Sequence, residues 1–167
     1  MKSLYIGIDN GTTGTIGFIG TGMERLVMME KMPVKVEQDY TQKNQKITRV
    51  DFPELLNLLE RFDRNNCLAI IENPMENSGK FKSTGSALRC LEAVMIACEK
   101  LCIGMEFKSS RKWQNVMLPK GIKGSTELKK ASRDIGIRLF PECKVIIEKH
   151  GDADGLLIAE WARRIDL

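Results

Sequence analysis

The chain opens with apolar runs that are separated by short glycine-containing breaks. Residues 3–9 are almost continuously apolar, a pattern typical of a strand buried on both faces. A second run covers residues 15–19 after a turn rich in glycine and threonine, and a third strand is expected near residues 23–29 after another glycine turn. Two short connections in succession predict an antiparallel meander of three strands.

Two different patterns follow this meander. Residues 33–50 are polar and lysine-rich with little periodicity, so we expect a long, mobile connection there. From Asp51 onward the apolar residues fall at helical spacing, with Asp51 as the candidate N-cap and Pro53 in the first turn. The stripe that this helix is expected to bury consists of Leu55, Leu56, Leu58, Leu59 and Phe62.

The second half of the chain alternates between strand-like and helical segments. Residues 67–71 predict a strand, and because a helix lies between it and the first strand, the two are expected to pair in parallel. The further expected elements are a loop over 73–84, a helix over 85–101, a strand over 105–108, a helix over 125–140 ended by Pro141, a short extended piece at 145–147 and a final helix over 152–164.

Together these elements predict an α/β fold. Its sheet is expected to be mixed and five-stranded, with the three-stranded meander joined to parallel strands and with helices on both faces. The 167 residues contain no internal repeat and no linker long enough to divide them. We therefore expect a single domain over residues 1–167.

The composition is that of a soluble globular protein, with 43% apolar and 29% charged residues. No apolar run approaches the ~18 residues of a membrane span, and the N-terminus lacks the layout of a signal peptide, so an intracellular, cytoplasmic protein with no membrane partner is expected. Five cysteines without a Cys-x-x-Cys pair, beside a single histidine, fit a structural zinc site poorly. Cys90, Cys98 and Cys102 follow a helical apolar pattern and are expected to be reduced core thiols.

Four acidic residues stand in settings that favour catalysis. Asp9 and Glu72 each end an apolar, strand-like run. Asp152 and Asp154 lie where the final helix is expected to begin. The carboxyl ends of adjacent parallel strands meet at one edge of a sheet, where α/β proteins usually bind ligands. Carboxylates that gather there need a cation, and one or two Mg²⁺ ions would allow the group to cleave phosphodiesters.

Each of these acids also has a simpler explanation. Asp9 could cap the glycine-rich turn, and Glu72 could be a surface residue at a strand end. Asp152 or Asp154 could serve only as a helix N-cap, where the helix dipole favours aspartate. One of these two aspartates can cap the helix while the other binds metal.

Positive charge is concentrated in residues 108–149, which hold eleven basic and four acidic residues, a net of +7 against +4 for the whole chain. Such a field suits a polyanion such as nucleic acid, although a solvated basic surface has the same composition. In the loop after Glu72, Phe81 could stack on an opened base or be tucked into the core. The candidate DNA-contacting residues are Lys80, Phe81, Lys82, Arg111, Lys112, Lys120, Lys123, Lys129 and Lys130.

Several of these segments together resemble one known group of enzymes. Residues 6–11 (Ile-Gly-Ile-Asp-Asn-Gly), the strand-final Glu72 and residues 153–159 (Ala-Asp-Gly-Leu-Leu-Ile-Ala) are similar to motifs of RuvC-like Holliday-junction resolvases, including viral members, in the RNase H-like superfamily. Residues 111–114 (Arg-Lys-Trp-Gln) and 139–141 (Leu-Phe-Pro) also look like that family. The resemblance spans nearly the whole chain.

This resemblance implies a Mg²⁺-dependent, structure-selective endonuclease that acts on branched DNA such as four-way junctions. Two Mg²⁺ ions are expected, for which Mn²⁺ could substitute. The catalytic and metal-binding residues would be Asp9, Glu72, Asp152 and Asp154. A homodimer is implied as well, because a four-way junction offers two symmetric cut sites.

Two positions depart from the family's pattern. Family members usually carry an acid or a histidine three residues before the last aspartate, where this chain has Gly151. Asp152 or His150 could fill that role; we expect Asp152 to be a ligand, and His150 either assists water activation or is exposed at the helix entry. Asn10 replaces a proline that is frequent after the first aspartate, a change expected to reduce rigidity without removing a ligand.

Three other functions remain open at this point. An RNase H-type nuclease acting on a flap or an RNA–DNA hybrid would need the same acids. Residues 7–13 are also similar to the phosphate-binding opening of sugar kinases in the actin-like ATPase group, but those enzymes need two such domains. A DNA-binding module with a degenerate active site would use the basic segment but leave the acids unexplained.

Overall fold

A five-stranded mixed sheet organises the computed structural model, which describes residues 2–22, 26–40, 43–62, 66–74 and 81–167. Its strands are β1 (Leu4–Ile8), β2 (Thr15–Gly20), β3 (Val27–Lys31), β6 (Cys67–Glu72) and β7 (Gly104–Lys108), in the order β3-β2-β1-β6-β7. The first three strands pair antiparallel, whereas β6 and β7 join parallel to β1. The expected meander and the parallel strands that join it are confirmed.

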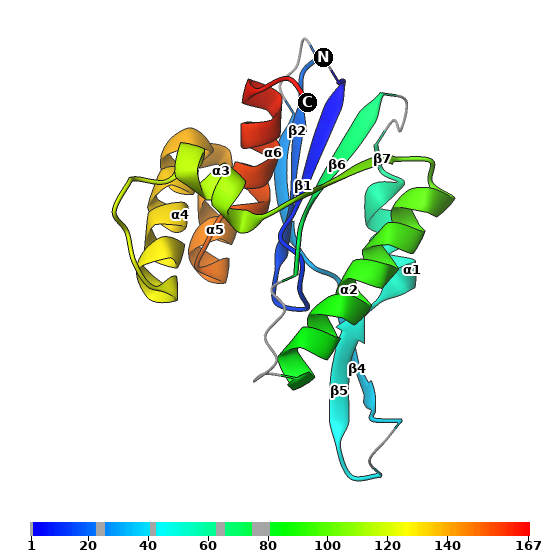
Figure 1. Ribbon diagram of the computed structural model, residues 1–167. Helices are drawn as coiled ribbons and strands as arrows, with labels where there is room; N and C mark the ends of the chain where they lie inside the picture. Colours follow the sequence, from blue (N-terminus) through cyan, green and yellow to red (C-terminus); the bar gives the residue numbers. More distant parts are fainter. Residues whose placement is uncertain (1, 23–25, 41–42, 63–65, 75–80) are drawn as a thin grey trace.

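Helices cover both faces of this sheet, as expected (Figure 1). One face carries α1 (Phe52–Leu59) and α2 (Phe81–Lys100). The other carries α3 (Ser110–Met117), α4 (Ser125–Leu139), α5 (Lys144–His150) and α6 (Asp154–Arg164). Alternation along β1 explains the two layers, because Leu4, Ile6 and Ile8 enter the core beneath α1 and α2 while Tyr5 enters the core beneath α6.

Helix α6 lies against β1 and β2 with almost no side chain between them. A Cβ atom at Gly7 would collide with the Gly155 carbonyl oxygen and the Ala159 nitrogen, and one at Gly17 would collide with the backbone of Gly155 and Leu156. From the helix side, a Cβ atom at Gly155 would lie 2.8 Å from the Gly17 nitrogen. Glycine is therefore required at all three positions for the helix to approach the sheet this closely.

The polar segment 33–50 was expected to be a mobile connection, and that expectation is wrong. Strands β4 (Val34–Gln38) and β5 (Lys46–Val50) pair antiparallel as a separate two-stranded hairpin. Figure 1 shows the hairpin projecting away from the main sheet below α2. Its β-branched residues alternate with polar ones, a weak period that its many lysines and glutamines obscured. The Tyr40 hydroxyl accepts a hydrogen bond of 3.2 Å from Arg89 on α2, which ties the hairpin to the main body.

Several further local expectations also need correction. Residues 145–147, expected to be extended because of their β-branched side chains, belong to α5, whose inner face buries Ile147 and which ends at the left-handed Gly151. The short helix α3 was not anticipated. Helix α2 begins at Phe81, within the range 73–84 that was expected to be a loop. Strand β3 is shifted toward the C-terminus of the expected range, and residues 23–25 of that range lie outside the described residues. Asp51 precedes α1 but makes no side-chain cap.

The cysteines are free thiols, and those at 67, 90, 98 and 143 are buried. Cys102 is exposed, contrary to expectation, because α2 ends before it and its backbone turns with a φ of 55°. Among the described helices, none combines the length and the apolar character that crossing a bilayer would require.

Candidate active site

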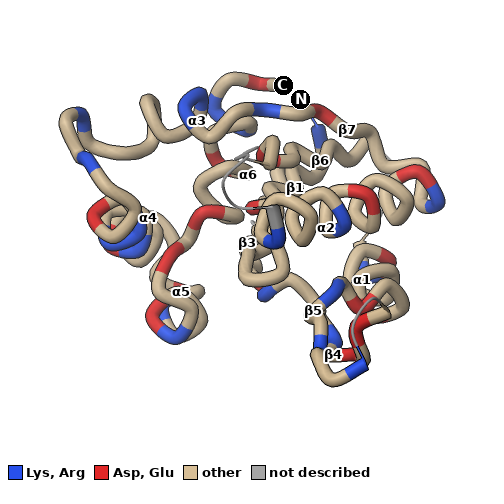
Figure 2. The backbone as a smooth tube through the Cα atoms, turned by 60° about the horizontal axis from the view of Figure 1, so that its bottom comes forward, with Lys and Arg blue, Asp and Glu red and all other residues tan. Residues whose placement is uncertain are grey.

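Three of the predicted carboxylates meet at the end of the sheet where β1 finishes. Asp9 directly follows β1, Asp154 is the first residue of α6, and Asp152 lies in the connection just before it. One carboxylate oxygen from each residue lies within 4.8 Å of those of the other two. Figure 2 turns this end of the sheet toward the viewer and shows acidic positions at the centre, between α5 and β1. We refer to Asp9, Asp152 and Asp154 as the acidic cluster.

Two buried hydroxyl groups hold the cluster in place. The backbone N–H of Asp9 donates to the Thr15 carbonyl (3.0 Å), and the Thr15 hydroxyl accepts from the Gly155 N–H (3.1 Å), so β2 links the first aspartate to the start of α6. The Ser132 hydroxyl on α4 donates a short hydrogen bond to Asp154 and accepts one of 3.1 Å from the Ala153 N–H. The sequence pattern did not single out either hydroxyl.

Glu72 lies beside the acidic cluster but is not a member of it. The pairing of Ile8 with Ile71 places Glu72 at the same level of the sheet as Asp9, as the sequence predicted. Its Oε2 atom accepts a hydrogen bond of 2.6 Å from the indole Nε1–H of Trp113, a buried residue of α3. The charge of Glu72 still affects Asp9, so all four acids share one electrostatic environment.

Burial and mutual repulsion perturb these carboxyl groups strongly. Burial, followed by the charges of Glu72 and Asp152, raises the pKa of Asp9 from 3.8 to about 7. Burial, then the charges of Asp152 and Asp9, raises the pKa of Asp154 to about 7 as well. For Glu72, burial raises the pKa to about 7 against the opposing hydrogen bond from Trp113. The raised pKa values mean that the positive charge near these carboxyl groups is too small to stabilise their ionised forms.

Asp152 is the most enclosed of the four acids, with 1% of its surface exposed, and two basic side chains contact it. Lys129 Nζ lies 3.1 Å from Oδ2, and His150 Nε2 lies 3.5 Å from Oδ1. Burial lowers the pKa of His150 against the pull of Asp152, so the imidazole is neutral near pH 7. Asp152 and His150 were the two candidates for the fourth active-site residue. Asp152 belongs to the acidic cluster, and His150 contacts Asp152 without joining the cluster.

The donor set fits a hard divalent cation. Carboxylate oxygens are the ligands that Mg²⁺ prefers, and a cation among them would offset the repulsion that raises their pKa values. Lys129 supplies one positive charge, which partial burial disfavours but the hydrogen bond to Asp152 and the nearby acids stabilise, so that its pKa is raised. One lysine does not balance four carboxylates, which leaves room for metal.

Asn10 adds a restraint that the sequence did not reveal. Its side-chain Nδ2–H donates to the Ala87 carbonyl (3.2 Å), which ties the turn after Asp9 to α2. The replacement of proline was expected to reduce rigidity here, yet this contact holds the turn by another route. The Asn10 Oδ1 atom is buried and has no hydrogen-bond partner among the described residues.

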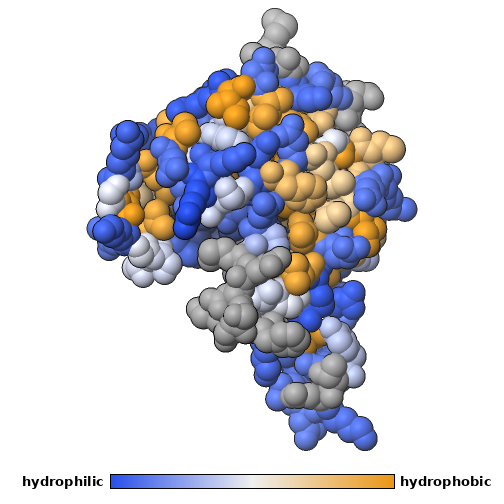
Figure 3. Space-filling view, in the orientation of Figure 1, coloured by the Kyte–Doolittle hydropathy of each residue, from blue (hydrophilic) through white to orange (hydrophobic). Residues whose placement is uncertain are grey.

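The predicted DNA-contacting residues surround the acids unevenly. Most of the candidate cations follow α3, the α3–α4 connection and α4, on one side of the acidic cluster (Figure 2). The exposed ones are Lys82, Arg111, Lys112, Lys120, Lys123, Lys129 and Lys130. Lys80 and the side chain of Phe81 lie outside the described residues. Figure 3 shows this hydrophilic side and, over α2 and β7, a more apolar one.

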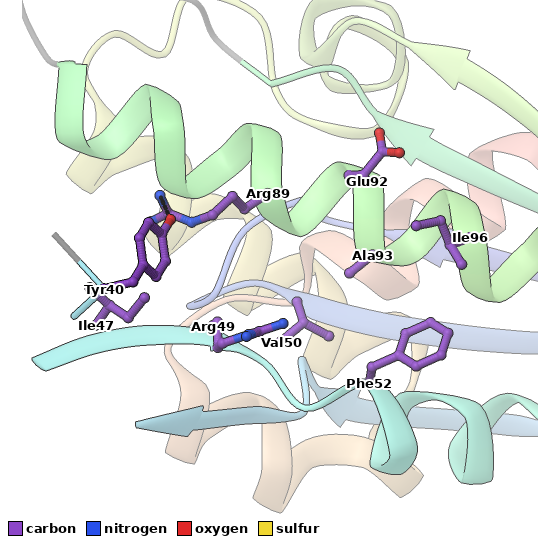
Figure 4. A pocket seen from close by; sticks show the side chains of 9 residues that line it. All are labelled: Tyr40, Ile47, Arg49, Val50, Phe52, Arg89, Glu92, Ala93 and Ile96. Carbon is purple, nitrogen blue, oxygen red and sulfur yellow. Dashed lines mark hydrogen bonds between the residues drawn. The ribbon is translucent and has the colours of Figure 1, made fainter. Parts of the chain in front are cut away.

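A separate groove of about 490 Å³ lies between the hairpin and α2 (Figure 4). Its walls are mainly apolar and include Ile47, Phe52 and Ile96. Its arginines already have partners, because Arg49 pairs with Glu37 and Arg89 bonds to Tyr40. None of the four acids lines it, so the chemistry suggested by the carboxylates lies elsewhere.

Comparison with known proteins supports the fold. No protein-family model and no curated protein sequence matches the chain. The solved structure of "T. thermophilus RuvC in complex with Holliday junction substrate" is 14% identical, covers 98% of this chain and 94% of that chain, and has a TM-score of 0.60. A second Thermus thermophilus RuvC structure is 15% identical over 98% and 96% of the two chains, with a TM-score of 0.52. The RuvC-like fold expected from the motifs is confirmed.

Proposed function

We propose that this chain is a metal-dependent endonuclease that cleaves phosphodiester bonds in branched DNA, with the four-way Holliday junction as its main substrate. The observation that carries the proposal is the convergence of Asp9, Asp152 and Asp154 on one point at the carboxyl end of β1. The fold shared with a RuvC that was solved together with a Holliday junction supports the substrate class.

The acidic cluster and Glu72 would hold Mg²⁺, for which Mn²⁺ could substitute. Bound there, two divalent ions would supply a nucleophilic water near neutral pH and would stabilise the negative charge on the leaving oxygen. The protein's own part is to keep four carboxylates in place despite their repulsion. Thr15 links Asp9 to the start of α6, and Ser132 donates a hydrogen bond to Asp154.

The basic residues would bring the DNA backbone to the acids. Lys129 already contacts Asp152, so a phosphate beside it would meet both a cation and the metal site. Arg111, Lys112 and the lysines of the α3–α4 connection would extend this contact along one arm of the junction. Lys82 would contact the backbone from the side of α2.

We also propose that the protein acts as a homodimer. A four-way junction has two symmetric cut sites, which a two-fold symmetric pair of active sites would match. Exposed apolar side chains support the presence of an interface on α2 and β7, where Leu88, Ile96 and Phe107 are each more than 40% exposed.

The decisive experiment compares three substrates under matched conditions. The purified protein is incubated with a synthetic four-way junction, a flap and an RNA–DNA hybrid, each with Mg²⁺ or with EDTA. We expect Mg²⁺-dependent cutting of the junction in preference to the other two. Preferential cutting of the hybrid or the flap would instead indicate an RNase H-type nuclease with another substrate.

The matched control for this experiment is Asp9→Asn, which keeps the shape of the side chain and removes its charge. This variant should cut the junction about 100- to 1,000-fold more slowly and still bind it in a gel-shift assay, because cutting needs the carboxylate while binding depends on the basic residues. Normal cutting by the variant would contradict the assignment of Asp9.

A further inference from the structure

Trp113 connects the DNA-contacting side of the molecule to the fourth carboxylate. It lies on α3 with 1% of its surface exposed, packed in the core beneath α6. Its two preceding neighbours on the same helix, Arg111 and Lys112, are exposed to solvent. One short helix therefore presents two cations outward and one indole inward.

The inward contact is directed at a single atom. The indole Nε1–H donates to Oε2 of Glu72 at 2.6 Å, a short hydrogen bond to a carboxylate. Because the ring is enclosed by core residues, the direction of its N–H is set by packing and not by solvent. The indole thus holds the Glu72 carboxylate in one orientation.

This contact keeps Glu72 beside the acidic cluster. A glutamate has three side-chain torsions, and a carboxylate repelled by Asp9 and Asp154 would otherwise turn away from them. Partners that hold a ligand carboxylate in this manner typically affect metal affinity by about 10- to 100-fold when removed.

We propose that Trp113 is a positioning residue that holds the Glu72 carboxylate where it would bind a metal ion, and that α3 thereby joins phosphate contact at Arg111 and Lys112 to the metal site. This inference rests on the proposed function, since it presumes that the carboxylates bind a divalent ion. Neither residue type nor spacing would assign this role to a tryptophan, because aromatic residues of a short amphipathic helix usually serve only the core.

The test compares Trp113→Phe with Trp161→Phe, which removes the other tryptophan, a buried residue of α6. Mg²⁺ and Mn²⁺ binding are measured by isothermal titration calorimetry in the absence of DNA. We expect Trp113→Phe to weaken metal binding by about tenfold and Trp161→Phe to leave it unchanged. In a Glu72→Gln background, Trp113→Phe should have no further effect, since it acts through that carboxylate.

A spectroscopic readout covers the case in which Trp113→Phe does not fold. In the Trp161→Phe protein Trp113 is the only tryptophan, so its fluorescence should change on addition of Mg²⁺, and the change should be absent when Glu72→Gln is added. In the Trp161→Phe protein with Glu72 intact, Trp113 is replaced by benzothienylalanine, which has sulfur in place of the N–H. This replacement should weaken metal binding as Trp113→Phe does.

The outcomes separate this inference from the proposed function. Equal metal affinity of the parent protein and the Trp113 variants would overturn the positioning role while leaving the nuclease proposal intact. A further loss of affinity when Trp113→Phe is combined with Glu72→Gln would also overturn it, because the tryptophan would then act through packing. A parent protein that binds no divalent ion would refute the proposed function itself.

Discussion

Asp9 and Asp154 are close enough to repel each other, yet hydrogen bonds and packing hold them together. Burial contributes most to their raised pKa values, and the neighbouring carboxylates add to it. The start of α6 lies at Asp154, so the positive end of the helix dipole offsets part of this charge. Each side chain is thus held in an ionisation state that depends on pH and on metal.

Stability without metal should fall as pH rises. The folded protein keeps protons on Asp9, Glu72 and Asp154 up to about pH 7, whereas the unfolded chain releases them near their ordinary values of 3.8 and 4.5. Between these limits the folded state binds more protons, so the free energy of unfolding decreases as pH increases. In EDTA, we expect the melting temperature to drop by about 4 °C or more from pH 5 to pH 8.

Calorimetric or fluorescence melting at both pH values measures this effect. Saturating Mg²⁺ should restore the melting temperature, and more so at pH 8, where the carboxylates are fully charged. Asp154→Asn should weaken the dependence on pH because one of the three groups is gone. A melting temperature that rises from pH 5 to pH 8 in EDTA would contradict the raised pKa values of these three carboxyl groups.

The Ser132 hydroxyl should contribute to both the stability of the fold and its affinity for metal. Ser132→Ala removes the hydroxyl that links Asp154 to the Ala153 N–H, which costs about 1–3 kcal/mol through an unsatisfied buried donor. Metal binding measured by calorimetry should weaken by about tenfold, because Asp154 loses the group that orients it. Ser125→Ala, at the exposed start of the same helix, is the matched control. Lower stability with unchanged metal affinity would limit Ser132 to packing.

Among the elements, α6 has the strongest influence on the site. Its first turn supplies Asp154, and its distance from the sheet is fixed by glycines on both sides. Since Asp9 directly follows β1, the gap between helix and strand also sets the gap between the two carboxylates. The spacing of the ligands is therefore a property of backbone packing.

Gly7→Ala tests this dependence. The added methyl group meets the Gly155 carbonyl and forces α6 outward, which should lower the free energy of unfolding by about 1–3 kcal/mol. Cutting should fall by about 100-fold, the typical effect of a displacement of about 1 Å in an active site. Gly104→Ala on β7, where the nearest atoms lie at 3.6 Å, should change neither quantity appreciably. Equal behaviour of the two variants in melting and cutting assays would contradict the model of a packing-defined gap.

The elements differ in how far the sequence predicts them. Strands β1, β2 and β6 are buried on both faces, so their apolar runs are unambiguous. The hairpin β4–β5 has one weakly covered face and a polar composition, which hides its period of two. In α5, the β-branched sequence Val145-Ile146-Ile147 favours a strand locally. The segment is helical because the helix packs Ile147 into the core.

At the scale of the whole molecule, most of the basic residues lie apart from the four acidic residues of the site. The acids lie at one end of the sheet, while the exposed cations of α3, the α3–α4 connection and α4 lie to one side. A DNA arm placed along these cations would lead into the acidic cluster. Its affinity should then depend on salt through the number of phosphates contacted.

Single substitutions test which basic residues contact DNA phosphates. For each of Lys120→Ala and Lys123→Ala, the slope of the logarithm of the junction-binding constant against the logarithm of salt concentration should become smaller in magnitude by about 0.9. Lys100→Ala, at the far end of α2, makes the same change in net charge and should leave the slope unaltered. Gel-shift titrations in EDTA at several salt concentrations give these slopes. Equal slopes for all three variants would argue against a defined path for the DNA.

The composition of the site was only partly predictable. Asp9, Glu72 and Asp154 stand at element ends, where local patterns identify them. Parallel pairing brings Asp9 and Glu72 to one end of the sheet, and packing of α6 on the sheet brings Asp154 to Asp9. Thr15, Ser132 and Trp113 contact the site from other elements, and no local pattern distinguishes them from ordinary core residues. Such contacts depend on the arrangement of whole layers, which a single sequence does not specify.

The glycines at the contact between α6 and the sheet have a consequence for recognising distant relatives. Gly7 precedes Asp9 by two positions, and Gly155 directly follows Asp154, so each carboxylate has a neighbour restricted for steric reasons alone. A search profile that scores each glycine jointly with its aspartate would combine a spatial and a chemical constraint. Such a profile should detect diverged proteins whose remaining residues have drifted beyond alignment.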